Sequence, residues 1–219
     1  MLPFRQIAHR RPGPNEHRSN LAMNILHIDS SERGADSVSR KLTAALVEKL
    51  AGGGSVTVTR RDLAGFSERI DGAWIGANYT PADQRSDAQK AALALSDTLV
   101  GEVKAADVLV IGVPVYNFSV PVTLKSWVDL MSRVGETFRY TEAGPEGLVT
   151  GKKAYLIMAS GGTGAGSVAD FASTYLTFVL GFWGITDVEV IAAEKVNVDA
   201  EAALKAANDG IAAIAPLAA

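Results

Sequence analysis

The stretch from Asp29 to Ser39 combines serine hydroxyls with the expected start of a helix. Its sequence is Asp-Ser-Ser-Glu-Arg-Gly-Ala-Asp-Ser-Val-Ser, and apolar residues at helical spacing follow it. The backbone N–H groups of Val38 and Ser39 would then point out of a helix N-terminus. The hydroxyls of Ser31, Ser37 and Ser39 would surround them. Such a helix end binds phosphate without a lysine, because its N–H groups are free and the helix dipole favours negative charge. Simple capping by Ser37 is the alternative, and it leaves Ser31 and Ser39 unexplained.

A second group of residues follows the apolar run at 108–113. This run, Val-Leu-Val-Ile-Gly-Val, is apolar on both faces, which is typical of a strand in the middle of a parallel sheet. It ends in Pro114, Val115, Tyr116, Asn117 and Phe118. Two aromatic rings and an amide suit a flat ligand with polar edges, because open α/β sheets bind ligands at the carboxyl ends of their strands. The alternative is a loop whose Tyr116 and Phe118 only pack.

A third loop is rich in glycine and follows another apolar run. It reads Ala159, Ser160, Gly161, Gly162, Thr163 and Gly164. Glycine lets the backbone approach a ligand closely, because it has no Cβ. The spacing is not that of a dinucleotide-binding fingerprint, since Ser167 stands where a third glycine is needed and the loop follows a late strand. Together the three loops predict a ligand that is phosphorylated at one end and flat at the other, which is the shape of FMN.

The elements that position these loops alternate along the chain. Strands are expected at 24–28, 55–60, 108–113, 153–158 and 185–191, and helical stripes at 38–50, 86–104, 121–131, 168–179 and 204–214. The alternation at 55–60 indicates an edge strand. Residues 62–85 are expected to be irregular, and residues 135–150 to form an excursion with a short strand at 138–140 and turns at 144–145 and 147. This order predicts an α/β fold, a flavodoxin-like doubly wound five-stranded parallel sheet with strand order 2-1-3-4-5.

Composition excludes several classes of protein. The chain has 219 residues and no cysteine, which excludes disulfides, thiolate zinc sites and a cysteine nucleophile, and we expect a cytoplasmic protein. The net charge is −3 and the first 22 residues contribute +3, so the remainder carries −6 and does not suit nucleic acid. No apolar run reaches the roughly 20 residues that span a membrane, so no membrane partner is expected.

Side-chain catalysis and metal binding are also not expected. His27 is the only histidine after residue 22 and lies in the middle of a strand, so a Ser-His-Asp arrangement is excluded. A packed or edge histidine, and not a base, is expected. Asp29 and Asp36 could form a pair of carboxylates, but they lack a third partner for a metal. We therefore expect no catalytic side chain and no metal.

Residues 1–22 differ from the rest of the chain. They hold three prolines, four arginines and two of the three histidines, and they lack the apolar core of a signal peptide. Met23 stands directly before the first expected strand. The simplest interpretation is a disordered extension upstream of the true start codon, followed by one domain at 23–219. A functional basic arm is the alternative.

The chain resembles the FMN-dependent NADH-azoreductases, also called quinone reductases, from residue 23 to about residue 215. The likeness lies in residues 114–118, 124–127 (Leu-Lys-Ser-Trp), 137–142 (Thr-Phe-Arg-Tyr-Thr-Glu), 144–148 (Gly-Pro-Glu-Gly-Leu) and 180–185 (Leu-Gly-Phe-Trp-Gly-Ile). It implies a homodimer with FMN at the interface and a ping-pong reaction. In that reaction NADH gives a hydride to the flavin and NAD leaves, and then a quinone or azo compound takes two electrons in the same place. Trp127 and Met131 supply apolar bulk beyond the needs of one sheet face, which also favours a dimer.

The resemblance also assigns site residues by position. It places the phosphate at Ser31, Ser37, Val38 and Ser39, the isoalloxazine at Val115, Tyr116, Asn117 and Phe118, and the pyrimidine end at Ala159, Ser160, Gly161 and Gly162. The family often has Met at 115 and Ser-Arg at 159–160, so the acceptor and the choice of NADH or NADPH stay open. The alternatives are a flavodoxin-type electron carrier, another flavodoxin-like FMN reductase, and a binding module without flavin.

Overall fold

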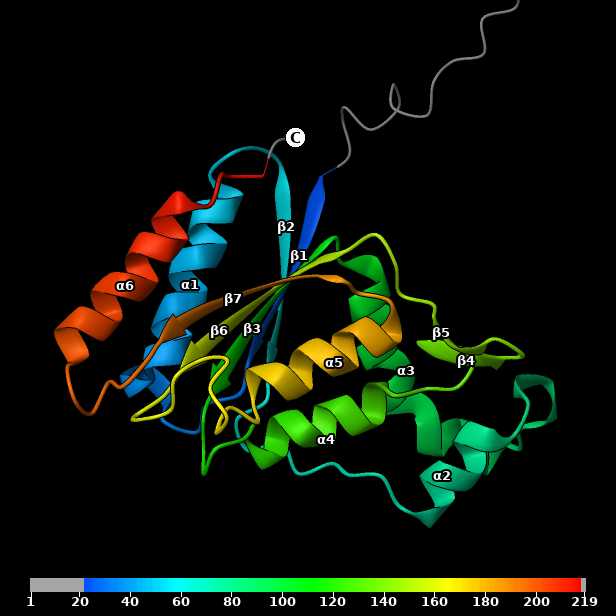
Figure 1. Cartoon of the computed structure of the whole chain (residues 1–219). Coiled ribbons are helices and arrows are strands. Elements are labelled where there is room, and N and C mark those ends of the chain that lie inside the picture. The colour runs from blue at the N-terminus through cyan, green and yellow to red at the C-terminus, as the bar shows by residue number, and fades with distance from the viewer. Residues whose placement is uncertain (1–21, 218–219) are drawn as a thin grey trace, which may run out of the picture.

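The computed structural model describes residues 22–217 and contains a parallel sheet with helices on both faces (Figure 1). The strands of this sheet are β1 (Met23–Asp29), β2 (Val56–Asp62), β3 (Val108–Pro114), β6 (Lys153–Ala159) and β7 (Asp187–Ala193). Their order, β2-β1-β3-β6-β7, is 2-1-3-4-5 along the chain. The predicted doubly wound fold is confirmed. The expected N-terminal extension falls on residues 1–22, of which 1–21 lie outside the described residues.

Helices cover the sheet in two layers. They are α1 (Val38–Ala51), α3 (Asp87–Ala105), α4 (Val122–Met131), α5 (Ser173–Trp183) and α6 (Ala200–Ala213). On one face Val108 and Val110 of β3 join a core with α1 and α6. On the other face Leu109 and Ile111 join a core with α3, α4 and α5. The whole of β3 is therefore buried, as its apolar run predicts, and β2 is the expected edge strand.

The segment at 62–85 is not wholly irregular, because it contains helix α2 (Gly72–Tyr79). The Asp71 carboxylate caps this helix by accepting the Trp74 N–H group at 2.8 Å. Trp74 and Ala77 are buried in the core that α3 shares. The sequence does not predict α2, because its glycines lower the helix propensity. The helix depends on tertiary packing instead.

Helix α5 begins at Ser173 and not near Val168, so that part of the predicted helix is wrong. Val168 is 99% exposed and Phe171 is exposed as well. The buried carboxylate of Asp170 accepts N–H groups from Gly166, Ala172 and Ser173 at 2.8–3.0 Å. An aspartate that bonds nearby N–H groups in this way stabilises a turn at the expense of helix.

A two-stranded hairpin lies outside the main sheet. Its strands are β4 (Phe138–Thr141) and β5 (Gly144–Gly147), which pair in antiparallel register. The short strand at 138–140 is confirmed. The turn predicted at 144–147 is wrong, because these residues form β5 and the turn occupies 142–143. Pro145 fits there because β5 is an edge strand.

The side chains of Trp127 and Met131 lie inside the protein. They are 1% and 0% exposed, and Trp127 packs edge-on against Trp183 with ring centroids 5.7 Å apart. The expectation that these residues offer apolar bulk to a partner is therefore wrong.

Among residues 22–217, no helix combines the length and the apolar character that crossing a bilayer requires.

Replacing Gly147 by alanine should destabilise the protein, because this glycine touches the end of α5. An added Cβ would lie 2.2 Å from the Gly184 nitrogen and 2.4 Å from the Trp183 carbonyl carbon, and neither backbone atom can yield cheaply. Overpacking of this kind lowers the free energy of unfolding by about 1–3 kcal/mol. Urea denaturation of Gly147→Ala measures the loss. Gly72→Ala, where nothing lies within 4 Å, is the matched control; equal stabilities of the two variants would contradict the contact.

Candidate functional site

The three expected loops meet at the carboxyl edge of the sheet, because β1, β3 and β6 are neighbours. The Ser30 hydroxyl donates to the Gly112 carbonyl oxygen at 2.7 Å, which joins the first loop to β3. The Val115 N–H group donates to the Ala159 carbonyl oxygen at 2.9 Å, which joins the second loop to β6. The loops are therefore held together at their bases, and two adjoining cavities open between them.

The inner cavity lies at the N-terminus of α1 and has a volume of about 160 Å³. Its serine side chains are nearly inaccessible, since Ser31, Ser37 and Ser39 are 1–2% exposed. These hydroxyls are shielded from bulk solvent but line the cavity, so a polar ligand inside it would meet them. The expected residues that line this cavity are Ser31, Ser37, Val38, Ser39, Val115, Tyr116, Ala159, Ser160 and Gly161.

The helix end at this cavity has both a cap and free donors. The Ser37 hydroxyl oxygen accepts the Arg40 N–H group at 3.3 Å and lies 3.1 Å from the Ser39 hydroxyl. Within residues 22–217, the N–H groups of Val38 and Ser39 have no acceptor. Ser37 thus caps the helix, as the alternative proposed, but two N–H groups at this helix end remain available to an anion.

The outer cavity, of about 640 Å³, shares Val115, Ser160 and Gly161 with the inner one. It is lined as well by the remaining expected residues, Asn117, Phe118 and Gly162. Asn117 and Phe118 have φ values of 49° and 72°, and a bulky side chain rarely adopts this left-handed conformation. Phe118 in this turn is 58% exposed, whereas a loop that only packed would bury it.

The glycine-rich loop is shaped by a serine and by a neighbouring asparagine. The buried Ser160 hydroxyl accepts the N–H groups of Gly162 at 3.2 Å and Thr163 at 2.7 Å. A Cβ on Gly161 would lie 2.4 Å from the Asn197 amide nitrogen. Gly161 is therefore required for Asn197 to reach the inner cavity, and Ser160 fixes the loop.

The sequence interpretation did not select every lining residue. Val196 and Asn197 line the inner cavity, Glu194 and Lys195 line the outer one, and all four follow β7. The predicted fifth strand ended at residue 191 and so left this loop unassigned. The predicted strand order could have identified this loop, because a fifth strand beside the fourth brings the loop after it to the same edge of the sheet. Arg33 lines the inner cavity and was also missed.

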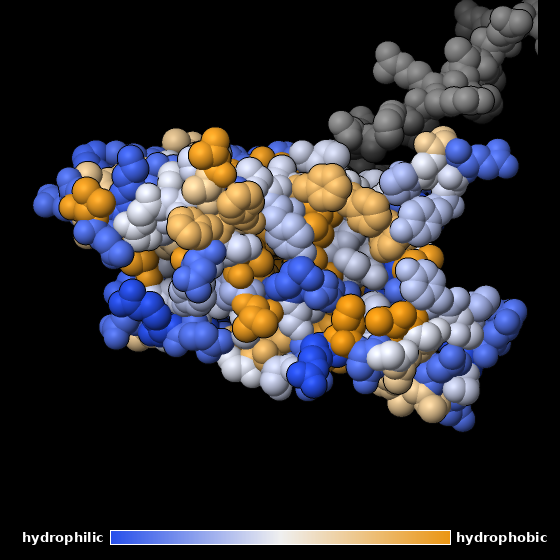
Figure 2. All heavy atoms as spheres, turned by 60° about the horizontal axis from the view of Figure 1, so that its bottom comes forward, coloured by the Kyte–Doolittle hydropathy of each residue, from blue (hydrophilic) through white to orange (hydrophobic). Residues whose placement is uncertain are grey.

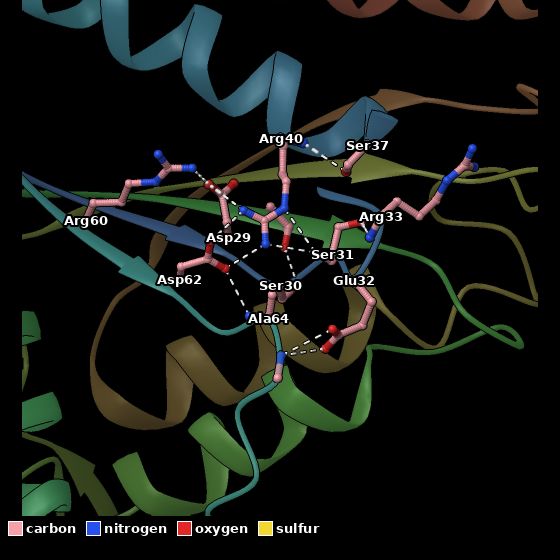
Figure 3. Close-up of polar contacts among 12 residues, drawn as sticks. Asp29, Ser30, Ser31, Glu32, Arg33, Ser37, Arg40, Arg60, Asp62 and Ala64 are labelled. Carbon is pink, nitrogen blue, oxygen red and sulfur yellow. Dashed lines mark hydrogen bonds and ion pairs between the residues drawn. The ribbon is translucent and has the colours of Figure 1, made fainter. Parts of the chain in front are cut away.

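Near the inner cavity, the fully buried carboxylate of Asp29 contacts two arginines and a threonine (Figure 3). Arg60 and the Thr43 hydroxyl donate to it at 2.8 and 2.9 Å, and Arg40 lies 3.5 Å away. The buried His27 side chain approaches the same carboxylate to 3.3 Å, so His27 is a packed histidine, as expected. The cluster joins the end of β1 to α1 and β2.

The charge of Asp29 is stabilised by these partners. Burial raises the pKa of Asp29, but the contact with His27 and the hydrogen bonds from Arg60 and Thr43 outweigh it and lower the pKa to about 2. Asp29 is therefore ionised over the whole neutral range, and its charge is balanced within the protein.

Comparison with known proteins agrees with this geometry. A family model described as a flavodoxin-like fold matches residues 23–215. FMN-dependent NADH:quinone oxidoreductase 1 of Jannaschia sp. is 56% identical over 191 residues, which cover 87% of this chain and 98% of that protein. The namesake from Hahella chejuensis is 53% identical and covers 89% and 96% of the two chains. The chain belongs to this flavodoxin-like family of FMN-dependent oxidoreductases.

Solved structures of family members extend the likeness to three dimensions. An azoreductase from Bacillus anthracis superposes with a TM-score of 0.77 at 27% identity, covering 87% of this chain and 95% of that one. An FMN-dependent NADH-azoreductase of the same species, solved in complex with FMN, has the same TM-score at 25% identity, covering 86% and 95%.

The residues present in this flavodoxin-like chain fit FMN. The free N–H groups of Val38 and Ser39 suit a phosphate, and the strained turn offers the Phe118 ring to a flat ring system. In the glycine-rich loop beside them, nothing lies within 4 Å of where a Cβ of Gly162 would be. The backbone there is open to close approach by a ligand.

Replacing Asp29 by asparagine should change how stability depends on acid. The pKa of Asp29 is lower in the folded than in the unfolded state, so its contribution is complete above about pH 4 and is lost as the pH falls toward 2. That contribution is about 2 kcal/mol. Urea denaturation at pH 7, 4 and 2.5 should show Asp29→Asn less stable at pH 7 and less sensitive to acid than the wild type.

The exposed Asp36, which forms no ion pair within residues 22–217, provides the control variant Asp36→Asn. It should keep the wild-type acid profile. If Asp29→Asn also kept that profile, the buried charge cluster would not stabilise the fold.

Proposed function

We propose that this chain is an FMN-dependent NADH:quinone oxidoreductase that also cleaves aromatic azo bonds reductively. The observation that carries the proposal is the pair of adjoining cavities, together called the groove, with free helix N–H groups at the inner one and the exposed Phe118 of the left-handed turn at the outer one. The names of the relatives and of the structural neighbours support the same reaction. When bound, FMN supplies the redox chemistry by accepting a hydride from NADH and delivering two electrons to the acceptor.

The chain's own residues bind and orient. The hydroxyls of Ser31, Ser37 and Ser39 and the N–H groups of Val38 and Ser39 hold the phosphate. Val115, Tyr116, Asn117 and Phe118 would hold the flavin ring, and Ala159, Ser160, Gly161 and Gly162 would hold its pyrimidine end. In the proposed reaction the chain's part is to bind and orient the cofactor and its two substrates.

Charge at residue 39 should decide whether FMN binds. Ser39→Ala removes at most one hydroxyl contact, which costs about a fivefold loss of affinity for a hydrogen bond of about 1 kcal/mol. Ser39→Asp places a negative charge at the helix N-terminus, where the phosphate must lie, and should weaken binding by more than about tenfold beyond the alanine variant. Fluorescence titration of the flavin-free protein with FMN measures both.

Ser39→Asn is the matched control, because asparagine has nearly the size of aspartate and no charge. It should bind FMN much better than Ser39→Asp. Equal affinities of these two variants would mean that the phosphate lies elsewhere.

The proposed reaction should follow ping-pong kinetics. Tyr116 lines the inner cavity and Phe118 the adjoining outer one, so their turn would border one slot over the flavin. A nicotinamide and a quinone that both need this slot cannot occupy it together. Plots of initial rate for the FMN-loaded chain with NADH and benzoquinone should therefore be parallel, with no partner reductase added. Intersecting lines would contradict the single slot, and absence of NADH oxidation would favour the electron carrier. The same assay with NADPH and with an azo dye establishes the preferences.

A second copy of the chain is the proposed partner of an apolar face beside the groove. Val122, Phe171 and Phe178 are 60–81% exposed, and Figure 2 shows apolar side chains scattered among polar ones over this side of the molecule. A cavity of about 600 Å³ opens there, lined by Ser119, Val120, Lys125, Phe171, Thr174, Tyr175 and Phe178. The Phe171 N–H group donates to the Phe118 carbonyl oxygen at 3.1 Å, so this face is continuous with the flavin turn.

Sedimentation at micromolar concentration should show a dimer, because exposed aromatic side chains of this density mark interfaces. Phe178→Glu should shift the protein toward monomer, since it places a charge on this face. Val198→Glu, at a position that is 79% exposed and lines none of these cavities, should leave the dimer intact. A wild-type monomer would contradict the proposal.

A further inference from the structure

The phosphate end of the groove has two arginines nearby, and one of them is fully engaged. Arg40 donates through Nη1 and Nη2 to the two carboxylate oxygens of Asp62, at 2.8 and 2.6 Å. Its Nε and Nη2 also donate to the Ser31 carbonyl oxygen at 3.0 and 2.8 Å. Figure 3 shows the Arg40 guanidinium enclosed by these acceptors. Arg40 therefore positions the backbone of Ser31. Its positive charge is already paired with the carboxylate of Asp62 and is not free for a ligand.

Arg33 is in the opposite situation. It is exposed and lines the inner cavity, and within residues 22–217 it forms no ion pair. Its N–H group donates to the Ser31 hydroxyl oxygen at 3.3 Å, which fixes its backbone beside the serines. Its side chain points away from the Asp29 cluster (Figure 3).

The acidic neighbour of Arg33 does not neutralise it. The Glu32 carboxylate accepts the Gly65 N–H group at 3.1 and 3.2 Å, and it points toward the loop after β2 rather than toward the cavity. Arg33 is thus a cation that lines the cavity and that no described carboxylate pairs with.

The donors assigned to the phosphate are all neutral, since they are backbone N–H groups and hydroxyls. A phosphate monoester carries between about one and two negative charges at neutral pH. An arginine can bind two phosphate oxygens at once through its planar guanidinium. We propose that Arg33 is the countercharge of the FMN phosphate, and that the ion pairs of Arg40 reserve that role for Arg33. This inference rests on the proposed position of FMN.

The test compares flavins with and without the phosphate. Fluorescence titration of the flavin-free, full-length chain gives dissociation constants for FMN and for riboflavin. Arg33→Gln should weaken FMN binding about two- to fivefold, which is the range of an exposed charge pair, and leave riboflavin binding unchanged. Arg33→Lys should restore most of the FMN affinity. The salt dependence of FMN binding should be smaller in Arg33→Gln than in the wild type.

Arg69→Gln is the matched control, because Arg69 is exposed, forms no ion pair within residues 22–217 and lines neither cavity. It should bind both flavins as the wild type does. If Arg33→Gln kept the wild-type preference for FMN over riboflavin, or lost both flavins equally, the role of Arg33 would be refuted and the site would stand. A wild type without any preference for FMN would refute the phosphate site itself.

Discussion

Burial of β3 on both faces is the constraint that decides where this chain can bind a ligand. A strand that fills two cores must lie in the middle of the sheet, with parallel neighbours on either side. Its carboxyl end then meets the ends of β1 and β6, and the N-terminus of α1 opens at the same place. The loops that bind a ligand are irregular, but the elements that carry them are not free to move apart.

The buried charges next to this edge of the sheet stabilise the fold and do not face a ligand. A buried carboxylate is costly unless it is paired, and Asp29 receives its partners from α1 and β2. Arg40, which approaches Asp29, also donates to the Ser31 carbonyl oxygen. The charge cluster therefore holds the first loop beside the cavity. The cavity itself is lined mainly by neutral donors. Such a lining suits a cofactor that carries its own reactivity, which agrees with the oxidoreductase family to which the chain belongs.

Local pattern and topology were enough to predict the order of the main strands and many, but not all, of the residues that line the cavities. Val108, Val110 and their neighbours form a run that only a central strand explains, and the serines and glycines lie where such strands end. Packing of distant segments decided the rest. Helix α2 forms because Trp74 finds a core, and α5 starts late because the Asp170 carboxylate holds a turn. The contact of Asn197 with the cavity depends on Gly161, a relation between two loops that neither loop reveals alone.

A crystal structure of the full-length chain with FMN tests the central claim most directly. The account predicts the phosphate within hydrogen-bond distance of the N–H groups of Val38 and Ser39, and the flavin ring against the turn that holds Tyr116 and Phe118. A phosphate away from the N-terminus of α1, or a flavin seated in the cavity between α4 and α5, would contradict it.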